Sequence, residues 1–266
     1  MWGKIRLAFT IRYWSRINDW KRLESITVGD WLTRLSGRAT YEKLWKPLLL
    51  AKLGENYTRV SAVFIWTYIK RMFSARDASA SREQMGYVKG GYKTVFDRLQ
   101  QIIEGAGGQI ELGVSVRNIR SSESRGLVIE NDKGTERFDK VVFTGPVNVL
   151  GKVVDDLLVD VEHSGESVEY LGVLCMALIT NCPLTPFYVL NLADERIPFT
   201  GVIGMSNVVE SDDTGGLYLT YLPKYLLSTD PELKRPEEEL RDEFLKGLRL
   251  IYPDLTDDQI VGSRIH

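Results

Sequence analysis

Residues 86–113 read GYVKGGYKTVFDRLQQIIEGAGGQIELG, and this stretch decides how the rest of the chain is interpreted. Between two glycine pairs, apolar residues recur at the spacing of one helix face: Val95, Phe96, Leu99, Ile102, Ile103 and Ala106. Gly107-Gly108 ends this predicted helix, because glycine adopts the positive φ of a C-terminal cap at little cost. Gly90-Gly91 precedes the helix, where free N–H groups and the positive dipole end face any neighbouring group.

The segment GAGGQI, which begins at residue 105, is not a dinucleotide fingerprint. The sixth position of G-x-G-x-x-G is here Ile110, and the fingerprint requires strand, turn and helix in that order, whereas here the helix comes first. Gly90-Gly91, in contrast, comes before a predicted helix, so the pair faces the helix N-terminus as a phosphate-binding turn does. Two interpretations stay open for that pair: a tight turn into the helix, or a ligand contact permitted by the missing Cβ.

The sequence predicts a run of short strands after this helix. They are QIEL (109–112), SVRNIRS (115–121), GLVIEND (126–132) and ERFDKVVFT (136–144), with turns at SESRG and NDKG. The last run ends in VVFT followed by Gly-Pro. A continuous apolar run of this length is typical of a strand buried on both faces.

Residues 1–82 are predicted to be helical. TVGDWLTRLSG (27–37) begins with the capping pattern of Thr27 and Asp30, and TYEKLWKPLLLAKLG (40–54) carries Pro47 at a kink or in an early turn. TRVSAVFIWTYIKRMF (58–73) is apolar on most sides, which predicts a buried helix. SARDASASRE (74–83) is small and polar, which indicates a loop between segments.

A second sheet is predicted from residue 165 to residue 226. Its strands are EYLGVLCMALIT, FYVLNLA, FTGVIGMSN and LYLTYLPKY, and PEEELRDEFLKGLRLIYP (236–253) follows as a helix with Pro236 in its first turn. The stretch DPELKRPEEELRDE is predicted to be a solvated loop and helix face. Two interpretations, lining a cavity or simple packing, stay open for five polar residues of the sheet: Tyr188, Asn191, Tyr218, Tyr221 and Tyr225.

The composition is that of an ordinary globular protein that is long enough for two domains. Of the 266 residues, 44% are hydrophobic and 26% are charged. Cys175 and Cys182 are predicted to be buried thiols in a reducing compartment. With only His163 and His266 available, neither a Cys/His metal cluster nor a Ser-His-Asp triad can be assembled, and we expect no metal.

Charge is distributed unevenly along the chain. Residues 1–82 carry 16 Lys and Arg against 6 Asp and Glu, whereas the remainder carries 18 against 30. This asymmetry indicates either an anionic partner or two solvated faces that attract each other. Near the N-terminus, Trp2, Trp14 and Trp20 alternate with basic residues, which predicts either a peripheral contact with an anionic membrane or a helix whose basic side chains snorkel. No signal peptide is recognised, and we expect a cytoplasmic protein, peripheral to a membrane under the first alternative.

From Gly86 to Pro146 the sequence resembles the flavin-dependent amine oxidoreductases, the group of monoamine oxidases, protoporphyrinogen oxidases and phytoene desaturases. In these, a G-G-x-x-x-L-like element leads into a helix, and a G-G-x-I-x-L-x-x-x-V-x-x-I stretch follows. A small antiparallel meander then ends in D-x-V-V-x-T-x-P, which returns to the FAD-binding sheet. The resemblance therefore implies an FAD cofactor and a small-molecule substrate, and no nucleic acid.

The resemblance also implies site residues. Gly90 and Gly91 match the glycines beside the flavin, and the three residues after them, Tyr92, Lys93 and Thr94, would line the substrate cavity. Val116 matches the valine whose backbone meets the adenine of FAD. The segment Thr144, Gly145 and Pro146 matches the loop after the returning strand, close to the cofactor.

Three departures from the family pattern qualify the resemblance. Nothing in residues 1–82 supplies the N-terminal G-x-G-x-x-G or its downstream acidic residue, and no glycine-containing C-terminal flavin segment follows. We therefore expect an internal fragment or a truncated product that does not hold FAD tightly alone. Where many amine oxidases carry a lysine near flavin N5, this chain has Leu174, Cys175 and Met176, which favours a larger, partly apolar substrate over a simple amine.

The sequence thus predicts an α/β (α+β) protein. A partial FAD-binding sheet with a three-stranded meander would occupy residues 84–150, and the substrate domain would combine helices from 1–83 with an antiparallel sheet and a helix from 151–266. The expected activity is that of an FAD-dependent oxidoreductase whose flavin accepts a hydride from a C–H or C–N bond. A flavin-dependent sugar-mutase-like isomerase and a non-enzymatic truncated binding module remain the alternatives.

Overall fold

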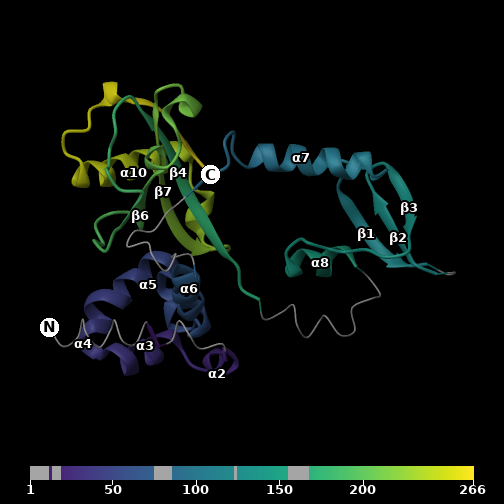
Figure 1. Cartoon of the computed structure of the whole chain (residues 1–266), viewed down its shortest axis with the longest axis horizontal. Helices are drawn as coiled ribbons and strands as arrows, with labels where there is room; N and C mark the ends of the chain where they lie inside the picture. Colours follow the sequence, from purple (N-terminus) through teal and green to yellow (C-terminus); the bar gives the residue numbers. More distant parts are fainter. Residues whose placement is uncertain (1–11, 14–18, 75–85, 123–124, 155–167) are drawn as a thin grey trace. The chain divides into compact units, whose positions relative to one another are not determined.

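A computed structural model describes residues 12–13, 19–74, 86–122, 125–154 and 168–266. The chain divides into two compact units, which we call the sheet unit (1–89 and 171–266) and the meander unit (90–170). The predicted loop after residue 74, Trp2, Trp14 and His163 lie outside the described residues. Figure 1 labels the helices and strands of both units.

The N-terminal half of the sheet unit is helical, as predicted. The Oγ1 atom of Thr27 accepts a hydrogen bond from the Asp30 N–H at 3.2 Å, which caps α3, and α3 ends before Gly37. Pro47 lies in the first turn of α5, where its missing N–H is tolerated. The elements are α2 (Lys21–Glu24), α3 (Val28–Ser36), α4 (Arg38–Thr40), a π-helical turn (Tyr41–Trp45), α5 (Lys46–Leu53), a 3-10 turn (Gly54–Thr58) and α6 (Val63–Ser74).

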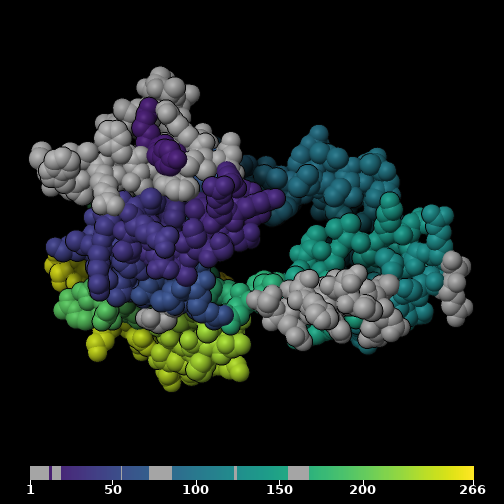
Figure 2. Space-filling view, turned by 90° about the horizontal axis from the view of Figure 1, so that it is seen from below, coloured from purple at the N-terminus to yellow at the C-terminus, as the bar shows by residue number. Residues whose placement is uncertain are grey.

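These helices form a core of their own. The buried residues include Leu23, Trp31, Leu49 and Trp66. Helix α6 begins at Val63, later than predicted, and buries one side rather than its whole circumference, since Thr67 is exposed. The helical layer, purple to blue in Figure 2, lies against the green and yellow sheet layer of the same unit.

The C-terminal half of the sheet unit is an antiparallel sheet in the order β5-β6-β7-β4-β8. Its strands are β4 (Leu171–Thr180), β5 (Val189–Asn191), β6 (Gly201–Gly204), β7 (Tyr218–Leu227) and β8 (Ile260–Ile265). Four of the five coincide with predicted strands. The fifth, β8, was not predicted, because Gly262 interrupts its short apolar alternation.

Helix α10 (Glu237–Ile251) covers one face of this sheet (Figure 1). Pro236 is its N-cap residue and does not lie in its first turn. The shared core contains Leu174, Met176 and Leu178 of β4 together with Leu240, Phe244 and Leu248 of α10. Short 3-10 turns connect the strands at Met205–Asn207, Ser211–Thr214, Pro231–Lys234 and Asp257–Gln259.

The meander unit contains the helix and the three-stranded meander that the sequence predicts. They are α7 (Tyr92–Gly105), β1 (Val116–Ser121), β2 (Leu127–Asn131) and β3 (Gly134–Phe138), followed by α8 (Val147–Val153). Gly107-Gly108 ends α7 as expected. Gly107 has φ +85°, and the Gly108 N–H donates to the Ile103 carbonyl at 2.9 Å.

Two predicted strands of this unit were wrong. Residues 109–112 form no strand, and VVFT (141–144) is neither a strand nor buried, since Val142 is 84% exposed. A strand forms only where a neighbour pairs with its backbone. Among the residues that the structure describes, none pairs with either segment in a ladder. Both segments therefore keep their strand-like composition but lack a partner.

The fold is a mixed α/β architecture, as the sequence predicts. Within the described ranges, no helix combines the length and the apolar composition that crossing a lipid bilayer requires.

Candidate functional site

The sheet of the sheet unit has one face that α10 does not cover. Side chains alternate along a strand, so the residues between Leu174, Met176 and Leu178 point away from α10. Residues paired directly across an antiparallel ladder share a face. We call this side the open face and define it by Val173, Cys175, Ala177 and Ile179 of β4, Tyr221 and Tyr225 of β7, and Ile203 of β6.

The open face is apolar and partly accessible. Val173 is 45% exposed and Ile179 is 37% exposed, whereas Leu174, Met176 and Leu178 on the other side are buried. Val189 of β5 continues the face, since it pairs with Ile203, and it is 43% exposed. An apolar sheet face that remains accessible is suited to covering an apolar ligand.

Aromatic groups gather at one end of the open face. Burial raises the pKa of Tyr225, and Tyr68 of α6 and Cys175 raise it further. Tyr68 is therefore close to Tyr225. The Arg71 guanidinium lies 4.8 Å from the centre of the Tyr68 ring, and the Lys52 ammonium lies 5.8 Å from it. This end of the face thus combines phenol rings with nearby cations.

The register separates the five polar sheet residues for which two interpretations were open. Tyr221 and Tyr225 lie on the open face, and Asn191 shares that side with Val189. Tyr218 pairs with Thr180, which is buried on the α10 side. Tyr188 precedes Val189 and so points the opposite way. Only part of the set can therefore contact a ligand on the open face.

The β4 strand offers no basic group to that ligand. Leu174 and Met176 are buried against α10, and Cys175 is half-buried on the open face. Burial raises the pKa of the Cys175 thiol, so the group is protonated and unreactive near neutral pH. Both cysteines are free thiols, as expected, but they are half-buried and not fully buried.

Gly90 and Gly91 form the turn before α7 in the meander unit. Their φ angles are +78° and +73°, a region that favours glycine. A Cβ on Gly91 would meet nothing within 4 Å, whereas one on Gly90 would lie 2.7 Å from the Thr94 hydroxyl. Gly91 therefore leaves open space at a helix N-terminus, the geometry that a polar ligand group requires for close approach.

The three residues after this turn lie on the exposed first turn of α7. Tyr92 is 78% exposed. The Lys93 ammonium contacts both carboxylate oxygens of Asp97, at 2.8 and 2.6 Å, along the same helix. Lys93 is thus held along the helix surface, and whether it lines a cavity together with Thr94 stays a prediction.

The other predicted cofactor contacts lie elsewhere in the meander unit. Val116 begins β1 and is 41% exposed, and Pro146 is the N-cap residue of α8. Thr144 and Gly145 are exposed on the segment before α8. These residues lie on separate elements of the meander unit, and their joint contact with a cofactor stays a prediction.

Sequence reasoning did not predict a cavity of about 760 Å³ in the sheet unit. Leu50 of α5, Phe199, Tyr225 of β7 and Gly247 of α10 contribute to its walls. Its lining also includes Lys224 and Asp230. No sequence signal could have revealed this cavity, since its walls come from four separate segments.

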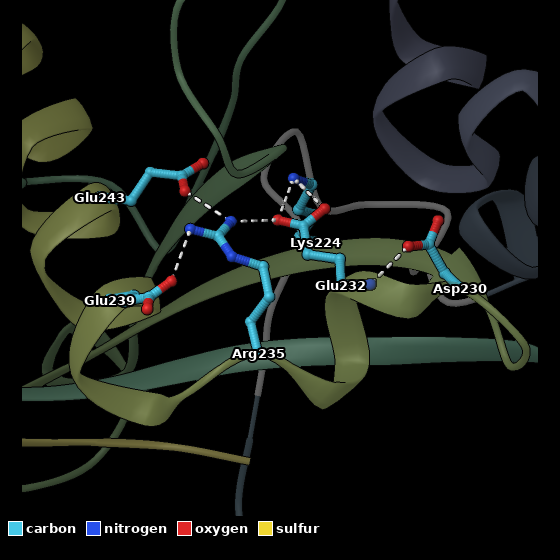
Figure 3. A network of polar contacts seen from close by, with 6 residues as sticks. All are labelled: Lys224, Asp230, Glu232, Arg235, Glu239 and Glu243. Carbon is cyan, nitrogen blue, oxygen red and sulfur yellow. Dashed lines mark hydrogen bonds and ion pairs between the residues drawn. The ribbon is translucent and has the colours of Figure 1, made fainter.

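A network of charged residues borders this cavity (Figure 3). The Lys224 ammonium contacts both carboxylate oxygens of Glu232 at 2.7 Å, and the two side chains are only 21% and 18% exposed. Arg235 contacts Glu232, Glu239 and Glu243 at 3.6, 3.8 and 2.7 Å. The segment DPELKRPEEELRDE was predicted to be a solvated loop and helix face. It instead takes part in a partly buried network of ion pairs that connects β7, the 3-10 turn Pro231–Lys234 and α10.

The sequence profile of the family described as "Flavin containing amine oxidoreductase" matches residues 2–264. The chain belongs to this family. Membership implies a flavin cofactor. No curated protein sequence matches the chain.

Solved structures share the fold at low sequence identity. An oxidoreductase from Methanosarcina mazei aligns with a TM-score of 0.73 and 16% identity over 99% of this chain and 60% of that one. A putative protoporphyrinogen oxidase from Exiguobacterium sp. 255-15 aligns at 0.69 and 18% over 99% and 59%. A reduced UDP-galactopyranose mutase aligns at 0.65 and 14% over 91% and 55%. The chain thus spans about three-fifths of these relatives or less.

The described residues fit one part of a flavin site. In the meander unit, the open space at Gly91 would let an isoalloxazine ring approach the backbone. In the sheet unit, taken by itself, the apolar open face suits an apolar substrate. The diphosphate of a dinucleotide requires a glycine-rich turn between a strand and a helix, and the 266 residues contain no G-x-G-x-x-G. The fit therefore covers the ring side and not the phosphate side.

Proposed function

We propose that this chain is the substrate-binding part of an FAD-dependent oxidoreductase that acts on a partly apolar substrate. The observation that carries the proposal is the open face, where β4 presents valine, cysteine, alanine and isoleucine and no amine. Bound FAD would accept a hydride from a C–H or C–N bond of the substrate. The chain's own residues would hold the substrate and exclude water from it.

The family resemblance supplies the cofactor residues, and the register of the sheet supplies the substrate residues. Gly90 and Gly91 would allow the flavin to approach the backbone, the Val116 backbone would meet the adenine, and the segment Thr144–Pro146 would lie close to the cofactor, as the family resemblance implies. Tyr221 and Tyr225 would lie against the substrate on the open face. No side chain needs to act as an acid or base, because the flavin carries the chemistry.

We further propose that the phosphate-binding part of the cofactor site is supplied by polypeptide outside this sequence. The apolar stripe of α7 supports this, because Phe96, Leu99 and Ile102 are 64%, 48% and 52% exposed. An amphipathic helix of this kind normally buries its stripe, and the chain covers only about three-fifths of its structural relatives.

The first test compares this chain alone with the product of the same reading frame extended through any in-phase G-x-G-x-x-G. We expect the extended protein to retain the visible absorbance of oxidised flavin through gel filtration, and the chain alone to lose it. If both proteins are colourless and FAD raises the melting temperature of neither, a non-enzymatic binding module is favoured.

The second test concerns the reaction. Anaerobic addition of an apolar C–H or C–N substrate to the flavin-loaded protein should bleach the flavin, and an added acceptor should restore its colour. The sugar-mutase alternative makes the opposite prediction, since a nucleotide sugar would then be converted without consumption of any oxidant.

A further inference from the structure

One row of side chains crosses the whole sheet on its open face. Reading along the ladders from β5 to β8, the register places five residues opposite one another: Val189, Ile203, Tyr221, Ala177 and Arg264. Directly opposed residues share a face. The row is therefore apolar or aromatic for four strands and ends in a guanidinium on β8.

Arg264 is available for a ligand. It is exposed, and within the described residues its side chain has neither a hydrogen bond nor an ion pair. A carboxylate near this strand, that of Glu237, accepts a hydrogen bond from the Ile265 N–H at 3.0 Å and so serves the backbone. Arg264 thus differs from Arg117 and Arg235, which pair with carboxylates at 2.7 Å.

The space above Gly262, beside Arg264 on the open face, is not filled by other atoms of the described residues. Gly262 lies two residues earlier on the same side of β8 and pairs with Ile179. A Cβ on Gly262 would meet nothing within 4 Å. Ile179 itself is 37% exposed. A ligand lying along the row would therefore find an open shelf beside the guanidinium.

We propose that the open face binds an amphipathic carboxylate, whose apolar body crosses Ala177, Tyr221 and Ile203 and whose carboxylate pairs with Arg264. This inference rests on the proposed function, since it names the substrate class for the same face. A planar guanidinium binds a carboxylate through two parallel hydrogen bonds. Adjacent strands lie about 4.8 Å apart, so the body would extend about 14 Å from β8 to β6.

Arg264 would be a specificity-determining residue, because it selects the anionic end of the ligand and contributes nothing to hydride transfer. A neutral molecule with the same apolar body would use the same row without the charged contact. The proposal therefore predicts a difference between two matched ligands, and this difference can be measured without flavin.

The experiment uses the whole purified chain with dodecanoate and, as its neutral counterpart, dodecanol, both below the concentration at which they aggregate. Binding is followed by titration calorimetry. We expect dodecanoate to bind more tightly than dodecanol. Arg264→Gln should weaken dodecanoate binding about tenfold to hundredfold and leave dodecanol unchanged, and Arg264→Lys should restore part of the loss.

Two further variants control for folding and for position. Arg241→Gln removes a cation from α10, outside the open face, and should leave both affinities unchanged. Gly262→Leu fills the open shelf and should weaken both ligands, with the same melting temperature as wild type. Equal affinity for the two ligands, or an Arg264→Gln protein that still prefers dodecanoate, would overturn the proposal, as would unchanged binding in Gly262→Leu.

These experiments distinguish a failure of the carboxylate site from a failure of the proposed oxidoreductase function. Carboxylate preference that depends on Arg264 supports this inference even if the flavin-loaded protein oxidises nothing. Conversely, flavin bleaching by a carboxylate substrate at the same rate and with the same concentration dependence in wild type and Arg264→Gln would support the oxidoreductase and reject the carboxylate site.

Discussion

Gly247 lies where α10 crosses the segment Pro198–Phe199, and replacing it with alanine tests the packing of the sheet unit. Gly247 is buried within the helix. A Cβ at this position would lie 2.4 Å from Pro198 Cδ, 3.1 Å from Pro198 Cγ and 3.4 Å from Phe199 Cε1. Ordinary carbon contacts lie at about 3.5–4.0 Å, so the added methyl group overlaps a rigid ring.

Two opposing effects determine the size of the change. Alanine in a helix interior is favoured over glycine by about 1 kcal/mol. Overpacking of a core typically costs about 1–3 kcal/mol, and the upper half of that range applies because neither the proline ring nor the helix backbone can rotate away. We therefore expect Gly247→Ala to lower the free energy of unfolding by about 1–2 kcal/mol.

The assay is urea unfolding followed by circular dichroism. The midpoint should fall while the dependence on urea concentration is unchanged. Lys246→Ala is the matched control, since Lys246 is the exposed neighbour on the same helix and should change stability by less than about 0.5 kcal/mol. In the Gly247→Ala background, Pro198→Ala should recover part of the loss. A Gly247→Ala protein as stable as wild type, or more stable, would refute the reasoning.

Three shorter predictions follow from charged and thiol groups. Glu232→Gln leaves the partly buried Lys224 without a counter-charge and should lower the free energy of unfolding by about 1–3 kcal/mol, measured by thermal and urea unfolding. Hydrogen bonds from Arg196 lower the pKa of Asp194 to about 2. Because this folded-state value lies below the ordinary one of about 3.9, the associated stability is present above about pH 4 and is lost as the pH falls toward 2. An NMR titration should locate the Asp194 midpoint there, and Arg196→Gln should return it to the ordinary range. Burial raises the pKa of Cys175, so mass spectrometry should find it alkylated more slowly by iodoacetamide in the native protein than in urea, and equal rates would contradict this.

The sequence alone predicts those elements whose start, end or buried face is encoded by residues close together in the chain. The cap at Thr27, the stripe of α7 and the acidic first turn of α10 are each encoded by residues within a few positions of one another. The three-stranded meander was also predictable, because alternation and turn residues specify short antiparallel neighbours.

Other features depend on partners that a local pattern cannot reveal. The apolar runs at 109–112 and 141–144 have strand composition, but pairing decides whether a strand forms. Conversely, β8 forms despite Gly262, because β4 provides a ladder for it. The open face and Arg264 depend on the register among five strands, which the sequence alone does not specify.

The division into units has a consequence for how the protein is made. The chain leaves the sheet unit between Lys89 and Gly90 and returns between Tyr170 and Leu171, so the meander unit is an insertion of about 80 residues. During translation, at roughly 5–20 residues per second, the N-terminal helices would leave the ribosome on the order of 4–16 seconds before β4 begins to follow. Their separate core allows them to fold during that interval. The surface that later meets the sheet would remain exposed until then, which makes this nascent intermediate a natural client for chaperones.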